Sequence, residues 1–184
     1  MFYIKLNNYQ KNGNIKISEN SVKNKGVKAI KNRLDTYCGL YCGSCEIFIT
    51  NQKGEVKETA KKWGMNPDDL YCNGCKTDTT SVFCRNCEIK ECAKNNEVEF
   101  CFQCRDFPCE KIIEFKNDEN PHHTIVLKNL TSIKEMGINK WLKEQEKRWS
   151  CPNCQENFSW YDEKCLNCGS SLKSCIDDEN EINK

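Results

Sequence analysis

Twelve of the 16 cysteines in this 184-residue chain form six Cys-x-x-Cys pairs, and each pair is half of a metal site. A gap of two residues lets both thiolates turn toward one cation, and two such pairs complete a tetrahedral four-sulfur site. The sequence therefore predicts a protein that binds several metal ions, with zinc the favoured metal. The pairs are Cys42/Cys45, Cys72/Cys75, Cys84/Cys87, Cys101/Cys104, Cys151/Cys154 and Cys165/Cys168.

The alternative use of so many cysteines is a disulfide scaffold, which requires export from the cytoplasm. Lys5 interrupts the apolar residues at the N-terminus, so we find no apolar core of the length that a signal peptide needs. No stretch is long and apolar enough to span a membrane, in agreement with a mean hydropathy of -0.79. We therefore expect a cytoplasmic protein without membrane association, whose reduced thiols bind metal.

The segment from Cys151 to Cys168 has the spacing of a zinc ribbon, in which two hairpin turns hold one ion. Residues 158–161, between the two turns, alternate in polarity as a strand does. A rubredoxin-like iron site would use the same four ligands, but the short intervening segment favours zinc. The predicted ligands are Cys151, Cys154, Cys165 and Cys168.

Eight further cysteines between residues 72 and 109 suffice for two four-sulfur sites. They pair in chain order, four and then four, or they interleave as in cross-braced zinc modules. The spacing does not decide between these two arrangements. The predicted ligands are Cys72, Cys75, Cys84, Cys87, Cys92, Cys101, Cys104 and Cys109.

Cys38, Cys42 and Cys45 have a C-x3-C-x2-C spacing that also occurs in iron–sulfur proteins. Radical S-adenosylmethionine enzymes use this triplet, but they need a long barrel of alternating strands and helices that this chain lacks. A zinc site here would need a fourth ligand. His122 and His123 are the only histidines, and we predict that one of them, here taken as His123, is that ligand.

Four helices are expected outside the cysteine pairs. Residues 56–63 have apolar side chains at helical intervals, and Gly64 follows as a stop signal. A second helix is expected to start near Pro108. Residues 126–136 form an amphipathic stripe that Gly137 ends, and Asn139 is placed to cap a further helix.

Together these patterns predict a small α+β fold, with a metal-stabilised Cys-rich domain, short helices, a helical connector and a C-terminal β zinc ribbon. Residues 1–33 contain eight Lys or Arg and one acidic residue, whereas the rest is mildly acidic, which argues against a strong phosphate-binding surface. The expected segments are a basic disordered tail (1–33), the Cys-rich metal-binding domain (34–120), the connector (121–149), the ribbon (150–174) and an acidic tail (175–184).

The order of these motifs resembles a prokaryotic Cys-rich family known as domain of unknown function 3795. The resemblance implies metal binding in the cytoplasm, and it supplies no activity. The residues that carry it lie in segments 38–45, 72–75, 84–93 and 100–111, and segment 129–149 with the ribbon is similar to members that have a C-terminal extension.

The sequence shows no Ser/His/Asp or Cys/His/Asn arrangement and no glycine-rich phosphate loop. Closed four-sulfur zinc sites are structural, whereas catalytic zinc keeps one position open. The leading interpretation is a cytosolic zinc protein of unknown specific role, a structural or interaction module that binds a protein or a nucleic acid without catalysis. The alternative is an iron–sulfur redox or sensor protein that uses Cys38, Cys42 and Cys45.

Overall fold

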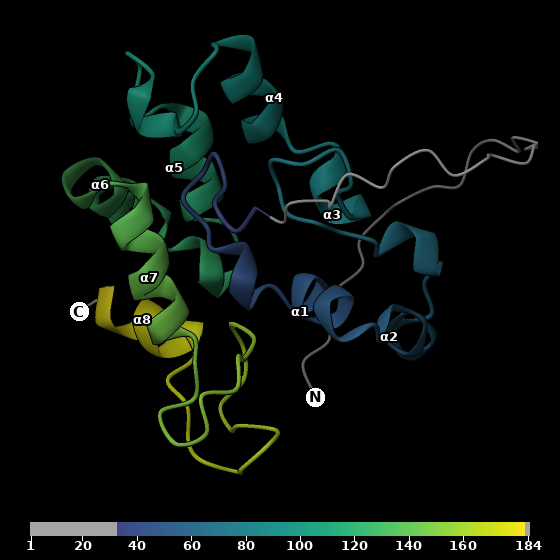
Figure 1. Cartoon of the computed structure of the whole chain (residues 1–184). Coiled ribbons are helices and arrows are strands. Elements are labelled where there is room, and N and C mark those ends of the chain that lie inside the picture. The colour runs from purple at the N-terminus through teal and green to yellow at the C-terminus, as the bar shows by residue number, and fades with distance from the viewer. Residues whose placement is uncertain (1–32, 183–184) are drawn as a thin grey trace, which may run out of the picture. The chain divides into compact units, whose positions relative to one another are not determined.

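The structure is a computed structural model that describes residues 33–182 (Figure 1). The predicted basic tail, residues 1–33, lies outside the described residues except for Arg33. The regular elements, in chain order, are η1 (Cys42–Ser44), α1 (Glu46–Lys53), α2 (Val56–Trp63), η2 (Pro67–Asp69), α3 (Val82–Arg85), α4 (Glu88–Asn95), η3 (Cys101–Gln103), α5 (Glu110–Lys116), η4 (Pro121–His123), α6 (Val126–Met136), α7 (Ile138–Arg148) and α8 (Cys175–Ile182), where η denotes a single 3-10 turn.

The predicted α+β fold with a β ribbon is wrong, because residues 33–182 contain helices and no β-strand. The backbone of residues 158–161 bonds to η1 and to the start of α8 instead of to a partner strand. The Trp160 amide donates to the Ser44 carbonyl at 3.1 Å, and the Cys175 amide donates to the Trp160 carbonyl at 2.7 Å. The described β pairing consists of isolated bridges at Asp35–Tyr41, Ser150–Asn157 and Lys164–Ser171.

The helix predictions are confirmed where apolar spacing and a glycine stop signal coincide. Helix α2 ends at Gly64, which takes the left-handed conformation with φ 66°. Helix α6 ends before Gly137 as expected. Helix α5 begins at Glu110, two residues after Pro108. The cap prediction is wrong, because α7 begins after Gly137 and therefore contains Asn139.

The main apolar core lies between α5, α6, α7 and the ribbon. Ile112, Leu130 and Trp141 are almost completely buried, and the ribbon residues Cys151 and Phe158 belong to the same cluster. Helices α6 and α7 follow one another and contact each other (Figure 1). The ribbon is thus packed on the helical connector, and the domain boundaries at residues 120 and 149 stay predictions.

A smaller core forms under α1 and α2, and it positions the loop that contains Cys72. Ile47, Ala60 and Leu70 are buried together with Cys72. Asn51 binds this loop to α1. Its side-chain amide donates to the Leu70 carbonyl at 2.7 Å, and its side-chain oxygen accepts from the Cys72 amide at 3.0 Å.

The segment expected as an acidic tail begins with helix α8, and residues 183–184 lie outside the described part of the chain. Asp177 and Asp178 lie in its first turn, where the helix dipole favours negative charge. The Ser174 amide donates to Asp177 at 2.7 Å, and Arg148 of α7 pairs with Asp178 at 2.8 Å. These contacts hold α8 against the end of α7.

Candidate metal centre

Two turns of the ribbon have the same backbone pattern and bring four cysteines together. In the first turn, the Cys151 amide donates to the Glu156 carbonyl and the Gln155 amide donates back to Cys151. The second turn repeats this pattern. The Cys165 amide donates to the Ser170 carbonyl, and the Gly169 amide donates to the Cys165 carbonyl. The fifth residue of each turn has a positive φ, 62° at Gln155 and 75° at Gly169. Such paired turns hold ligands at fixed positions around one ion.

The sulfur atoms of Cys151, Cys154, Cys165 and Cys168 all lie within 4.8 Å of one another. Cys151 Sγ is 3.6 Å from Cys168 Sγ, and Cys154 Sγ is 3.5 Å from Cys165 Sγ. A tetrahedral zinc ion with bonds near 2.3 Å separates its sulfur ligands by about 3.8 Å. The four residues therefore fit a tetrahedral metal ion. Their spacing in the sequence predicted that they bind one ion together.

Asparagine side chains link the two turns. Hydrogen bonds from the Asn167 side chain and the Glu156 amide lower the pKa of the Cys154 thiol. Hydrogen bonds from the side chains of Ser170 and Asn153 lower the pKa of the Cys168 thiol to about 5. Each asparagine thus supports a thiolate of the opposite turn. Hydrogen bonds of this kind orient metal ligands and tune their basicity.

Cys165 has the opposite tendency, because the neighbouring Cys154 and Cys151 thiols act together with burial. The Cys168 amide lowers the pKa of the Cys165 thiol, but burial and the neighbouring Cys154 thiol outweigh it and raise the value to about 11. A buried thiol of this kind loses its proton when a metal cation binds to the sulfur atom. Cys151 is also buried, whereas Cys168 is exposed, so one side of the centre faces solvent.

The other predicted cysteine ligands are less tightly gathered. Within residues 33–182, no second group of three or more His, Cys, Asp or Glu ligand atoms lies within 4.8 Å of one another. Burial raises the pKa of the Cys101 thiol to about 12, and the charges of Cys109, Cys92 and Cys104 act in the same direction. Cys92, Cys101 and Cys109 also line one small cavity, and pairing in chain order and interleaving both stay open. Their ligation stays a prediction, as does that of Cys38, Cys42, Cys45, Cys72, Cys75, Cys84 and Cys87.

The described structure does not bring His123 into a three-ligand group with Cys38, Cys42 and Cys45. His123 Nδ1 lies 2.8 Å from a carboxylate oxygen of Asp118. Its ring stacks on a phenylalanine of α5, with centroids 3.7 Å apart. The histidine ligand stays a sequence-based prediction.

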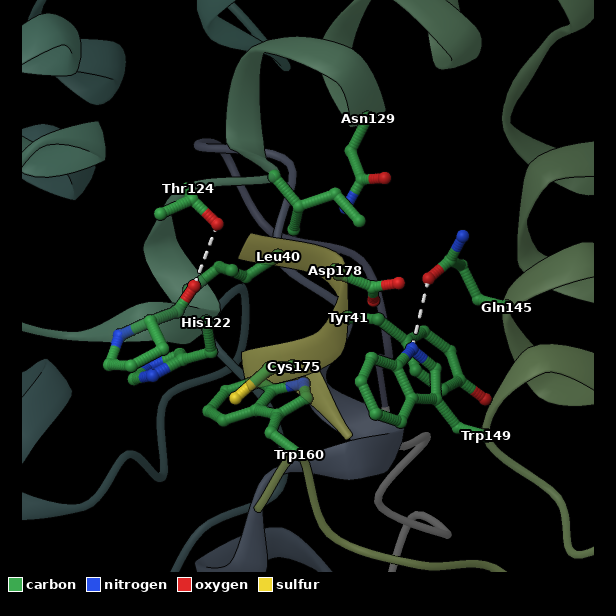
Figure 2. Close-up of a pocket in the computed structure, with 12 residues that line it drawn as sticks. Leu40, Tyr41, His122, Thr124, Asn129, Gln145, Trp149, Trp160, Cys175 and Asp178 are labelled. Atoms are coloured by element: carbon green, nitrogen blue, oxygen red, sulfur yellow. Dashed lines mark hydrogen bonds between the residues drawn. The ribbon is translucent and has the colours of Figure 1, made fainter. Parts of the chain in front are cut away.

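His122 belongs to an aromatic cluster beside the ribbon. Its Nδ1 lies 2.6 Å from the hydroxyl oxygen of Tyr161, and its ring stacks on Trp160 with centroids 4.1 Å apart. Burial lowers the pKa of His122 well below its usual value, and the charge of His123 acts in the same direction. Figure 2 shows His122, Trp160 and Cys175 on one side of a small pocket. Its cavity volume of about 10 Å³ suits at most one water molecule.

None of the described helices has the length and apolar character needed to cross a bilayer.

The comparisons with known proteins agree with the Cys-rich part of this description. Comparison with curated proteins found no match, and comparison with solved structures found none either. Residues 34–114 match the family model described as "Protein of unknown function (DUF3795)". This match supports the family resemblance for that part of the chain. No family match covers the ribbon.

Proposed function

We propose that this chain is a cytoplasmic zinc protein whose ions stabilise the fold and position surface loops for a protein partner, without chemistry at the metal. The observation that carries the proposal is the closed set of four sulfur atoms in the ribbon. Zinc with four cysteine ligands has no open position for a substrate or a reactive water molecule. A structural role follows from that closure.

The donor set also supports zinc over harder cations. Thiolates select zinc, copper(I) and iron–sulfur clusters, whereas carboxylates and carbonyls suit magnesium and calcium. The sulfur atoms are already at separations near those of a tetrahedral ion, and the metal needs no rearrangement of the turns. Metal binding at such a site contributes folding free energy directly.

The exposed tip of the second turn supports the interaction part of the proposal. Leu166 lies between two ligands, Cys165 and Cys168, and is 88% exposed. A metal-held turn keeps such a side chain in one orientation, which reduces the entropy lost when a partner binds. We propose a protein partner because this turn exposes the apolar side chain of Leu166 and not a basic surface.

Metal analysis of anaerobically purified protein tests this function. We expect a colourless protein with zinc, and we expect cobalt substitution to produce tetrahedral spectra with sulfur-to-metal charge transfer. Replacement Cys154→Ser should remove about one metal equivalent. Cys175→Ala is the matched control, because Cys175 is a buried thiol outside the four-sulfur group. A brown protein that contains iron would contradict the proposal and support the iron–sulfur redox or sensor alternative.

The interaction part needs its own measurement. Replacement Leu166→Asp should weaken pull-down of the partner from the native cell extract and leave the metal content unchanged, because the side chain is exposed. Retention of an unchanged set of bound proteins would contradict the role assigned to this turn. Loss of binding after nuclease treatment would identify nucleic acid as the partner instead.

A further inference from the structure

The four cysteines of the ribbon differ in their access to solvent. Cys151 and Cys165 are buried, and Cys154 is half-buried. Cys168 is exposed, and among the 16 cysteines of the chain, all of which lie within residues 33–182, it alone is exposed. A reagent dissolved in the surrounding water therefore meets this thiol more readily than any other in the chain.

The residues beside Cys168 keep it at the outer surface of the second turn. Leu166 is 88% exposed, and Asn167 and Gly169 are exposed as well. Ser170 Oγ lies 3.2 Å from Cys168 Sγ, so the nearest polar side-chain contact of this sulfur is a small hydroxyl group. The turn thus leaves the sulfur open to a small solute.

A buried sulfur of the other turn lies within reach of Cys168. Cys168 Sγ is 3.6 Å from Cys151 Sγ, and the other two sulfur atoms of the group form a second close pair at 3.5 Å. The two sulfurs of a disulfide are about 2.05 Å apart, so a relative shift of about 1.5 Å would join Cys168 to Cys151. Such a bond would use up two of the four metal ligands.

The base of the ribbon is held by contacts that do not involve these sulfur atoms. Phe158 packs against Trp149, with ring centroids 5.5 Å apart. Lys53 of α1 forms an ion pair with Glu156 at 2.8 Å. Loss of the metal would therefore free the exposed tip of the second turn, whereas the base would stay packed on the helices.

We propose that Cys168 is an oxidation site through which hydroperoxides release the ribbon zinc ion. This inference rests on the proposed zinc function and adds a means of regulating it. The Cys168 thiolate attacks one oxygen of hydrogen peroxide, the O–O bond breaks, and a sulfenic acid and a hydroxide ion form. The Cys151 thiolate then attacks the Cys168 sulfur, the S–O bond breaks, and a disulfide and a second hydroxide ion form.

The electron balance of these two steps closes. The two thiolates lose two electrons in total, and one molecule of peroxide accepts both. Cys154 and Cys165 are then the two thiolates that remain for the ion, and two ligands do not hold zinc in a tetrahedral site. A dithiol reverses the oxidation by thiol–disulfide exchange and forms its own disulfide.

The exposed turn converts this chemistry into a change at the surface. Leu166 lies between two of the ligands, and the bonds from Cys168 to the ion join this tip to the first turn. After oxidation the tip no longer has a fixed orientation, so binding of a partner costs more entropy. Peroxide would thus weaken the interaction that the ribbon makes, and a dithiol with zinc would restore it.

Peroxide treatment of the zinc-loaded, full-length protein tests the proposal. One molar equivalent of hydrogen peroxide should release about one zinc ion per chain, measured with a chromophoric zinc indicator. Trypsin cuts after Arg148, Lys164 and Lys173, so Cys151 and Cys168 fall in different peptides. Mass spectrometry should find these two peptides joined by a disulfide between those residues. A dithiol with added zinc should reverse both results.

Two histidine variants form a matched pair. Cys168→His and Cys154→His each leave three thiolates and one imidazole, which is a common tetrahedral zinc site. The Cys168→His protein should keep its ribbon zinc in peroxide, because the exposed sulfur is gone. The Cys154→His protein should release it as the unchanged protein does. If either variant fails to retain zinc before oxidation, the disulfide mapping of the unchanged protein decides.

Hydrogen exchange shows whether the change is local. Exchange of the amides in residues 165–170 should increase after oxidation, whereas exchange in α6 should stay the same. An equal increase in both segments would overturn the local switch in favour of general unfolding.

The remaining outcomes separate this inference from the proposed function. Equal zinc release from the two histidine variants would overturn the role of Cys168, and so would a first disulfide at cysteines outside the ribbon. Zinc that stays in the ribbon during peroxide treatment would overturn the inference and leave the zinc function standing. A ribbon without zinc before oxidation would contradict both.

Discussion

The side-chain amide of Asn129 donates a hydrogen bond of 2.9 Å to the carbonyl oxygen of Gly39, although 90 positions separate the two residues. Asn129 is buried in α6, and Gly39 follows Cys38 in the turn that precedes α1. A Cβ atom at Gly39 would lie 2.9 Å from Leu130 Cγ, so α6 packs directly on this turn. The connector helix thus positions the first cysteines of the Cys-rich domain.

Replacement Asn129→Ala should destabilise the protein by about 1–3 kcal/mol, because the buried Gly39 carbonyl would lose its donor. Urea unfolding of the zinc-loaded protein measures this cost. Asn139→Ala in α7 is the matched control, since Asn139 is exposed, and it should change stability by no more than about 0.5 kcal/mol. Equal effects of the two substitutions would contradict the assigned role of the hydrogen bond.

Gly74 should be far less tolerant of alanine than Gly54. Both have positive φ, 112° and 74°, and the strain of a left-handed residue costs each variant about 1–2 kcal/mol. A Cβ at Gly74 would also lie 1.9 Å from the Arg33 carbonyl oxygen, whereas nothing lies within 4 Å at Gly54. We expect Gly74→Ala to lower the unfolding midpoint well beyond Gly54→Ala and to reduce total zinc. Similar midpoints would show that the loop at Gly74 adjusts freely.

Asn167→Ala should weaken zinc binding at the ribbon by about 10–100-fold, because it removes a donor to the Cys154 thiolate. Competition with a chromophoric chelator gives this affinity. The cobalt spectrum should remain tetrahedral, since all four sulfur ligands are still present. Asn139→Ala again serves as the control. An unchanged zinc affinity of the Asn167→Ala variant would contradict the role assigned to Asn167.

Acidification should destabilise the aromatic cluster through His122. Burial lowers the pKa of His122 in the folded protein, with His123 acting in the same direction, while the unfolded chain titrates near the usual value of about 6.5. The unfolded state therefore binds more protons, so this contribution is fully present above about pH 6.5 and decreases as the pH falls. We expect His122→Gln to unfold with a weaker pH dependence between pH 7 and 5. Parallel pH profiles for both proteins would rule out a buried neutral His122.

Local spacing in the sequence determined which atoms could meet within one short segment. The pairs Cys151/Cys154 and Cys165/Cys168 were assigned to one site because a two-residue gap directs both sulfurs to one side of a turn. Helix α2 and helix α6 were predicted for the same reason, since an apolar stripe with a terminal glycine is a property of neighbouring residues. These features need no information about distant parts of the chain.

The tertiary structure alone decided what depends on pairs of residues far apart in sequence. The ribbon has no strand at residues 158–161, because the backbone of Trp160 bonds to Ser44 and Cys175. Helix α8 stands where a tail was expected, and the ion pair between Arg148 and Asp178 holds it against α7. Such contacts follow from the packing of separate helices around a common core, and no periodicity within one segment encodes that packing.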